Sequence, residues 1–117
     1  MAQAFTKAKL SGSTNGKGIK VVQTATLGTT IHTAVSGTSS YDEIWLYAYN
    51  GHTADVVLTI EWGEATVPDG NIVIAIPFKS GRYLVVDGRL LNNSLVVTAF
   101  AGTANVIVID GYVNQIV

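Results

Sequence analysis

The sequence predicts an all-β protein: an antiparallel β-sandwich of jelly-roll or Greek-key type, with about eight strands. Short runs rich in Val, Ile and Thr alternate with clusters of Gly, Asn, Asp and Ser, a pattern typical of strands joined by turns. No segment shows the periodicity of an amphipathic helix. The 117 residues suffice for one core, and no cysteine is present to form a disulfide. We therefore expect one sandwich domain at 19–117, preceded by an N-terminal arm at 1–18.

The arm is expected because residues 11–18 are rich in Gly and Ser. Before this stretch, Phe5 and Leu10 are the only large apolar residues and could anchor the arm. An arm of this kind docks on a neighbour or frays. Beyond it, runs of alternating or β-branched residues predict strands at 19–26, 29–35, 44–49, 56–62, 72–78, 83–86, 95–101 and 105–109. Residues 112–116 are expected either as a ninth strand or as a continuation of the eighth past Gly111.

The stretch 41–62 dominates the pattern, because two alternating runs flank Asn50 and Gly51, which favour a tight turn, and so predict a β-hairpin. Both faces of its first strand carry large apolar side chains: Ile44, Leu46 and Ala48 on one, and Trp45, Tyr47 and Tyr49 on the other. A strand with one face exposed to solvent does not need large apolar side chains on both faces. The aromatic face is therefore expected to meet either the second sheet or another molecule, with part of it at a contact.

Composition favours burial against other proteins. Charged residues make up 13% of the chain, against about 25% in an average soluble domain, and hydrophobic residues make up 48%. Interface cores are depleted in charge and enriched in aromatic residues, so we expect an oligomer. The net charge of −1 and the scattered Lys and Arg argue against a nucleic-acid partner. No apolar run approaches the roughly 18 residues of a membrane span, and no secretion signal is expected.

Catalytic and metal-binding motifs are not found. The two histidines, His32 and His52, lie in a predicted strand and a predicted turn, and neither has the setting of a catalytic base. We therefore expect no enzyme activity, no cofactor and no metal site. One alternative is a carbohydrate-binding module in which Trp62, Tyr49 and Glu61 hold a sugar, although a core Trp beside an edge Glu is the commoner arrangement.

Several segments resemble small virion proteins of tailed bacteriophages. The most recognisable are 41–49, 60–63, 90–100 and 105–114, and the resemblance covers most of residues 38–117. It implies a capsid decoration (cement) protein, a β-sandwich that caps sites between major capsid subunits on the capsid exterior, commonly as a homotrimer. Such a protein is made in the host cytoplasm.

The expected partners are thus the major capsid protein and further copies of the chain, with no membrane partner. The expected contact residues are Phe5 and Leu10 in the arm, and Trp45, Tyr47 and Tyr49 on the aromatic face. Neck, tail and fibre-base proteins of the virion are the other structural roles left open.

Overall fold

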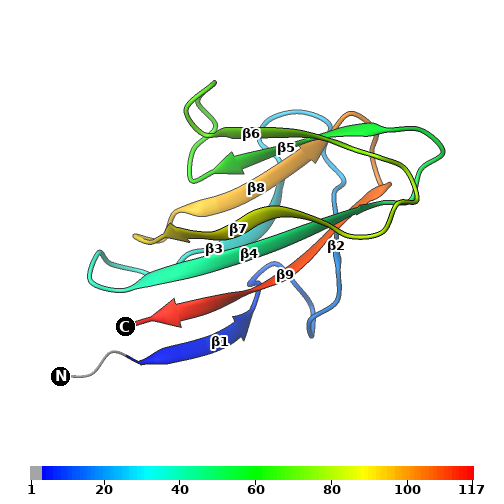
Figure 1. Ribbon diagram of the computed structural model, residues 1–117. Helices are drawn as coiled ribbons and strands as arrows, with labels where there is room; N and C mark the ends of the chain where they lie inside the picture. The colour runs from blue at the N-terminus through cyan, green and yellow to red at the C-terminus, as the bar shows by residue number, and fades with distance from the viewer. Residues whose placement is uncertain (1–3) are drawn as a thin grey trace.

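The computed structural model describes residues 4–117 and is all-β, with nine strands and no helix in this range. The strands are β1 (Phe5–Lys9), β2 (Ile19–Lys20), β3 (Thr29–Thr33), β4 (Tyr41–Asn50), β5 (Val56–Trp62), β6 (Asn71–Ile76), β7 (Tyr83–Leu91), β8 (Val96–Ala101) and β9 (Ile107–Ile116). They form two antiparallel sheets that pack as a sandwich, as predicted (Figure 1). Sheet A has the order β1-β9-β4-β7, with β2 also paired to β9, and sheet B has the order β3-β8-β5-β6.

The strand pairs are nested around the β5–β6 hairpin. Outward from it, β4 pairs with β7, β3 with β8, and β2 with β9, and successive pairs alternate between the two sheets. A long hairpin wound into two sheets in this way is a jelly roll. The structure therefore has jelly-roll rather than another Greek-key connectivity, and β1 extends it by pairing with β9 beyond β2.

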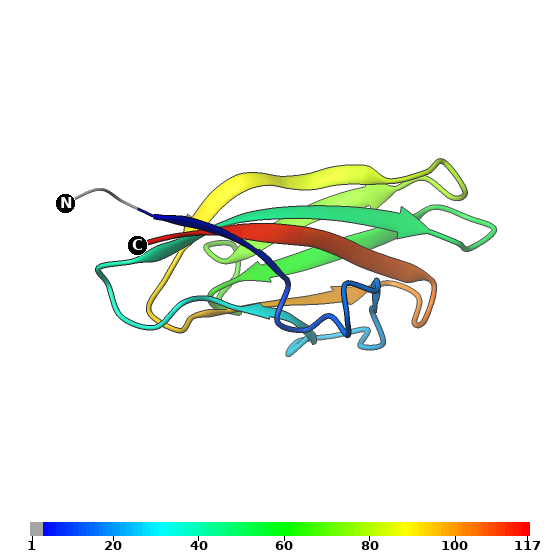
Figure 2. The ribbon, with the colours of Figure 1, turned by 90° about the horizontal axis from the view of Figure 1, so that it is seen from below.

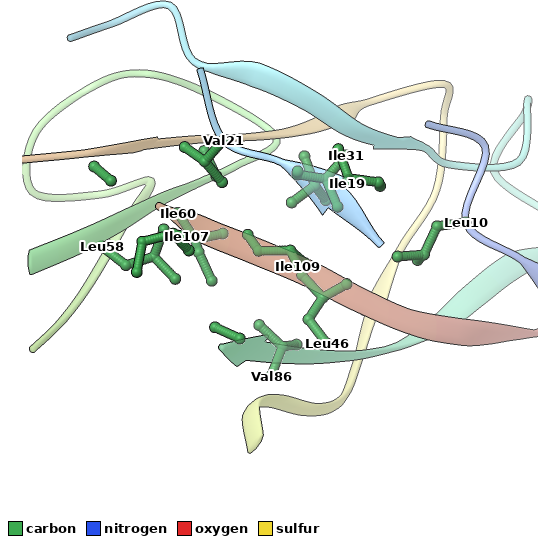
Figure 3. Close-up of a cluster of buried hydrophobic side chains, with 14 of the residues drawn as sticks. Leu10, Ile19, Val21, Ile31, Leu46, Leu58, Ile60, Val86, Ile107 and Ile109 are labelled. Atoms are coloured by element: carbon green, nitrogen blue, oxygen red, sulfur yellow. The ribbon is translucent and has the colours of Figure 1, made fainter. Parts of the chain in front are cut away.

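The core lies between the two sheets, which Figure 2 shows as two layers. From sheet A, Ile44, Leu46 and Ala48 are fully buried, as the alternation predicted. Leu58 and Ile60 face them from sheet B. Figure 3 shows the centre of this cluster, to which both sheets and the segments around β2 contribute Leu10, Ile19, Val21, Ile31, Leu46, Leu58, Ile60, Val86, Ile107 and Ile109.

The expected hairpin at 41–62 is wrong in one respect: β4 and β5 do not pair, because they lie in opposite sheets. The turn at Asn50 carries the chain across the sandwich. The Asn50 side chain is fully buried and donates to the carbonyls of Ala54 and Ile76, at 3.0 and 2.8 Å, while its oxygen accepts the His52 N–H at 2.8 Å. Asn50 thus fixes a crossover rather than a two-stranded turn.

Strand lengths also differ from those predicted. The run 19–26 keeps only β2, because the chain after Val21 leaves the strand direction, and Gly28 comes to lie on sheet B beside Glu61. At the other end, 105–109 and 112–116 join into the single strand β9, so continuation past Gly111 is confirmed. A Cβ at Gly111 would lie 1.9 Å from the Trp45 carbonyl oxygen, which explains glycine in the middle of this strand.

Within the expected arm at 1–18, the segment Phe5–Leu10 packs on the sandwich domain. Phe5 begins β1, which is hydrogen-bonded along the edge of sheet A. Leu10 is 2% exposed and belongs to the core, so it cannot reach a neighbouring molecule. A strand and a core anchor hold this segment on the domain. Residues 1–3 of the expected arm lie outside the described residues.

Candidate interaction surface

The outer face of sheet A carries the aromatic residues singled out from the sequence. Trp45 and Tyr47 are half-buried there and Tyr49 is 38% exposed, on the side of β4 opposite to the core. Tyr112 of β9 stands beside Trp45 in the sheet register and joins them. We call these four residues the aromatic face. The aromatic face does not meet the second sheet. Of the two positions expected from the sequence, packing between the sheets is therefore excluded.

Stacking and two cations hold three of the four rings in place, those of Trp45, Tyr47 and Tyr112. The Trp45 and Tyr112 rings are stacked, with centroids 6.2 Å apart and planes 14° from parallel. Lys7 Nζ lies 4.4 Å from the Tyr112 ring centroid, and the Arg82 guanidinium lies 4.3 Å from that of Tyr47. Such cation–π contacts are worth about 0.5–1 kcal/mol at exposed sites. These three rings are thus positioned before any partner arrives.

Two charged groups among the rings, those of Glu43 and Arg82, have hydrogen-bond partners. Glu43 Oε1 accepts hydrogen bonds from Asn114 Nδ2 and Trp45 Nε1, both at 2.9 Å. These two bonds, with Asn114 the larger cause, lower the pKa of Glu43 from its ordinary value. Arg82 also binds Asp110, at 2.7 Å between Nη2 and Oδ1. A partner that covers this face therefore meets polar groups that already have partners, which lowers the cost of their burial.

The outer face of sheet B is different, because its strands expose no charged side chain. The ionisable groups of β3, β5, β6 and β8 are His32 and Glu61, which are 5% and 1% exposed. Apolar residues occupy the open part of this face: Val57 is 49% exposed and Val73 is 62% exposed, with Phe100 half-buried beside them. The scarcity of charged residues in the sequence is thus most pronounced on the outer face of sheet B.

Glu61 is a structural acceptor. Its Oε1 accepts hydrogen bonds from Gly28 N at 2.8 Å and Thr98 Oγ1 at 2.6 Å, and its Oε2 accepts one from Thr26 Oγ1. Burial raises the pKa of Glu61 and is the largest single cause, but the hydrogen bonds from Thr26, Thr98 and Gly28 outweigh it, so the pKa is lowered. The carboxylate holds the segment before β3 against sheet B.

The sugar site considered from the sequence does not assemble. Trp62 is 6% exposed in the core, where the Arg89 guanidinium lies 5.0 Å from its ring centroid. Glu61 is buried on sheet B, and Tyr49 lies on the outer face of sheet A. These three side chains therefore cannot stack on and bind one sugar ring.

His32 lies in a strand, β3, as the sequence predicted, and its side chain is buried. Its Nε2 lies 2.7 Å from Asp42 Oδ2, and its Nδ1 accepts the backbone N–H of Ser11 at 3.0 Å. With Nδ1 accepting, Nε2 carries the proton and donates to Asp42. Both ring nitrogens are thus used to tie the segment after β1 to β3 and β4. Asp42 was not predicted as a partner, since nothing in the local sequence links it to His32.

A shallow pocket of about 370 Å³ lies at one end of sheet B. Its lining is mostly apolar and includes Leu27 and Leu95, which are 66% and 42% exposed. Glu64 is the ionisable residue among its walls. Residues 4–117 contain no group of three or more His, Cys, Asp or Glu side chains placed to hold a metal ion. Within the same residues, no helix is present that could cross a membrane.

Of the five contact residues expected from the sequence, Phe5, Trp45, Tyr47 and Tyr49 reach the surface, and Leu10 does not. Phe5 is 70% exposed on β1 and flanks the aromatic face from the edge of sheet A. Tyr112 was missed because its run was separated from the others by Gly111, and alternation alone does not tell which strand lies beside β4. Comparisons with protein-family models, with curated proteins and with solved structures find no match to this chain.

Proposed function

We propose that the chain is a non-enzymatic structural protein of a tailed-phage virion, and that it acts as a capsid decoration protein. The observation that carries the proposal is the aromatic face, four rings on the outside of sheet A, of which Trp45, Tyr47 and Tyr112 are stacked or braced by a cation. Interface cores are rich in Trp and Tyr, and rigid rings lose little conformational freedom on binding. The assignment to a phage virion comes from the resemblance of most of residues 38–117 to small virion proteins.

The proposed partner of the aromatic face is the major capsid protein, with Phe5 as an additional contact at the edge of the same sheet. The proposed mechanism is clamping. A copy bound across two capsid subunits stabilises the assembled shell by mass action, because it does not bind the separated or unfolded subunits. The resemblance implies a homotrimer, in which several contacts must break together before one copy leaves.

The jelly roll is compatible with this role but does not decide it. Jelly rolls occur in viral capsid proteins and also in lectins and cupins. A neck, tail or fibre-base role is the first alternative, and it differs in the number of copies per particle. Hundreds of copies spread over the shell support decoration, whereas a few to a few dozen at one vertex or along the tail support the alternative.

The experiment is a binding assay with expanded shells of the cognate particle that lack this protein. We expect the purified chain to bind them and Tyr49→Asp to bind at least tenfold more weakly. The matched control is Tyr83→Asp, because Tyr83 is 37% exposed against 38% for Tyr49 but pairs with the core-facing Ala48, so that it lies on the opposite side of sheet A from the rings. A wild-type chain that ignores the shells, or equal losses in both variants, contradicts the proposal.

A second candidate, carbohydrate binding, draws on the same rings, since aromatic faces stack on sugars. Tryptophan fluorescence titrated with a panel of polysaccharides separates the two, because Trp45 is half-buried on the aromatic face whereas Trp62 is in the core. Saturable change with one polysaccharide, abolished by Trp45→Ala, would favour the sugar. A flat response across the panel rejects it.

A further inference from the structure

The edges of the two sheets are protected unequally. Sheet A ends in β7 on one side and in β1 and the two-residue β2 on the other, and sheet B ends in β3 and β6. An unprotected edge strand offers unpaired N–H and C=O groups to any other strand, and proteins block such pairing with charges, bulges or covering segments. The four edges of this sandwich differ in these protections.

Two of the edges carry charges or irregularities. On β1, Lys7 and Lys9 alternate along an edge whose residues are all exposed. On β7, Asp87 and Arg89 are exposed on either side of Gly88, which has a φ of +81°, and the pairing with β4 shifts register twice. Both features discourage the approach of another strand.

The third edge is covered. β3 has a register shift between Thr30 and His32, and the segment after β1 lies along its outer side. Gly12 N donates to the Ile31 carbonyl at 3.0 Å, and Thr33 N donates to Ser11 Oγ at 2.7 Å. Two backbone groups of β3 that point away from β8, the Ile31 carbonyl and the Thr33 N–H, thus already have partners.

The fourth edge is β6, which lies at the outside of sheet B (Figure 1) and has none of these protections. Its sequence NIVIAI contains no charge and no proline, and it pairs with β5 over six residues without a register shift. Trp62 N donates to the Gly70 carbonyl at 2.6 Å, so the alternation of antiparallel bonds turns the backbone groups of Val73 and Ala75 away from β5. Within residues 4–117, neither makes a backbone hydrogen bond on that side.

The side chains of β6 are equally open. Ile72 and Ile74 point to the core side but remain half-buried at its margin, where the sandwich ends. Val73, on the other side of the strand, is 62% exposed. A strand placed next to β6 would cover apolar surface on both sides of the sheet and satisfy the free backbone groups at the same time.

We propose that β6 pairs antiparallel with β6 of a second copy of the chain, with Val73 facing Val73 of that copy. In this register Ile72 faces Ile74 of the second copy, so apolar residues meet on the core side. Val73 and Ala75 donate their outward N–H groups across the contact. The Asn71 N–H is already bonded to the Pro68 carbonyl and is not needed. The two four-stranded sheets then join into one sheet of eight strands.

A second copy is the partner that fits, because the strand is self-complementary about Val73 and contains no charge that would require an opposite charge elsewhere. A two-fold contact uses the same surface on both molecules. It is separate from the three-fold contact of the proposed trimer and does not depend on a capsid role, since it forms from the purified chain alone.

The first test measures self-association by sedimentation equilibrium over a wide concentration range. We expect wild type to show a dimerisation step, and Val73→Pro to weaken it about 100-fold, because Pro lacks the outward N–H and leaves the opposed carbonyl unpaired. The change removes no bond to β5. The control is Val57→Lys, an exposed valine on the same face of sheet B in the internal strand β5, which should dimerise like wild type. A wild type without a dimerisation step, or an unchanged Val73→Pro, overturns the proposal.

The second test concerns the register. Val73→Lys and Val73→Asp each place like charges opposite one another across the two-fold axis, so each should dimerise several-fold more weakly than wild type. Mixed in equal amounts, the two variants should associate more strongly than either alone. If mixing restores nothing, residue 73 does not face its own copy and the register is wrong.

The third test needs no variant. Amide hydrogen exchange of wild type is measured by NMR at low and high protein concentration. The Ile72 and Ile74 amides, paired to β5, should be protected at both. The Val73 and Ala75 amides should exchange rapidly when dilute and slow at least tenfold when concentrated. Concentration-independent exchange at Val73 overturns the proposal even if every variant fails to fold.

Discussion

Replacement of Glu61 by Gln tests the interpretation of this carboxylate as the group that holds the segment before β3. Glu61 is 1% exposed and accepts three hydrogen bonds, from Thr26, Gly28 and Thr98. Gln has the same shape but carries no charge, and one of its two terminal groups is a donor. The variant therefore changes the strength of the bonds and leaves the packing almost unchanged.

The magnitude follows from the bonds. Hydrogen bonds to a charged group contribute about 1.5–3 kcal/mol and neutral ones about 0.5–1.5 kcal/mol, so each bond loses roughly 1 kcal/mol in the variant. Part of this loss is offset, because Gln does not pay the cost of burying a charge. We expect Glu61→Gln to lower the free energy of unfolding by about 1–2 kcal/mol at pH 7.

The pH dependence gives the sharper test. Because the pKa of Glu61 is lower in the folded chain than its ordinary value of about 4.5, the stabilisation is fully present above that value. It is lost as the pH falls through the folded-state pKa. The stability difference between wild type and Glu61→Gln should therefore be largest near pH 7 and shrink toward pH 3. The Glu43 carboxylate, whose pKa is also lowered, is present in both proteins and cancels from the difference.

The assay is urea unfolding followed by tryptophan fluorescence at several pH values between 7 and 3. Asp69→Asn is the control, because it also removes one negative charge but lies in an exposed turn. It should follow wild type at every pH. A difference between wild type and Glu61→Gln that stays constant from pH 7 to pH 3 would refute the hydrogen-bonded carboxylate as the source of the stabilisation.

The remaining predictions concern the core, the sheet and the aromatic face. Leu10→Ala should lower the free energy of unfolding by about 2–5 kcal/mol, whereas Phe5→Ala, at a 70% exposed position, should change it by about 0.5 kcal/mol or less; chemical denaturation measures both. Gly111→Ala should abolish soluble folded protein, because its Cβ would lie 1.9 Å from a carbonyl oxygen of β4, whereas Gly102→Ala, whose Cβ would meet only an atom 4.0 Å away, should express and melt like wild type. Tyr47→Asp should keep the far-ultraviolet circular dichroism spectrum of wild type while it loses assembly with its partner. A Tyr47→Asp chain that cannot fold would instead place Tyr47 among the residues that the sandwich needs for stability.

Alternation along the run 44–49 was enough to predict which of its side chains face the core. Ile44 and Leu46 are buried and Trp45 lies outside, because a strand turns successive side chains to opposite faces whatever its neighbours are. The same rule identified an all-β sandwich and the exact bounds of β5. The direction of a side chain and the bounds of a strand depend on neighbouring residues in the chain, so the local sequence pattern is enough to predict them.

Neighbouring strands could not be predicted in the same way. Asn50 and Gly51 signal a change of direction, but the signal is the same for a hairpin and for a crossover between sheets. The outcome depends on which distant strands pair with β4, and these are β7 and β9. Leu10 was misassigned for a similar reason, since one leucine among polar residues gives no periodicity. Its burial depends on β2 and β3, which follow it in the chain.

The position of β9 has a consequence for how the chain folds. β9 pairs with β1, β2 and β4. In the pairing with β1, Phe5 lies opposite Ile116, which is far from it in the sequence. Sheet A therefore cannot close on the ribosome before β9 has emerged from the exit tunnel. Until then, the inward apolar side of β4 has only transient cover, and a chaperone has its longest opportunity to bind there. Because most of the sheet pairs residues remote in sequence, refolding should be slow for a domain of this size, on the order of milliseconds to seconds.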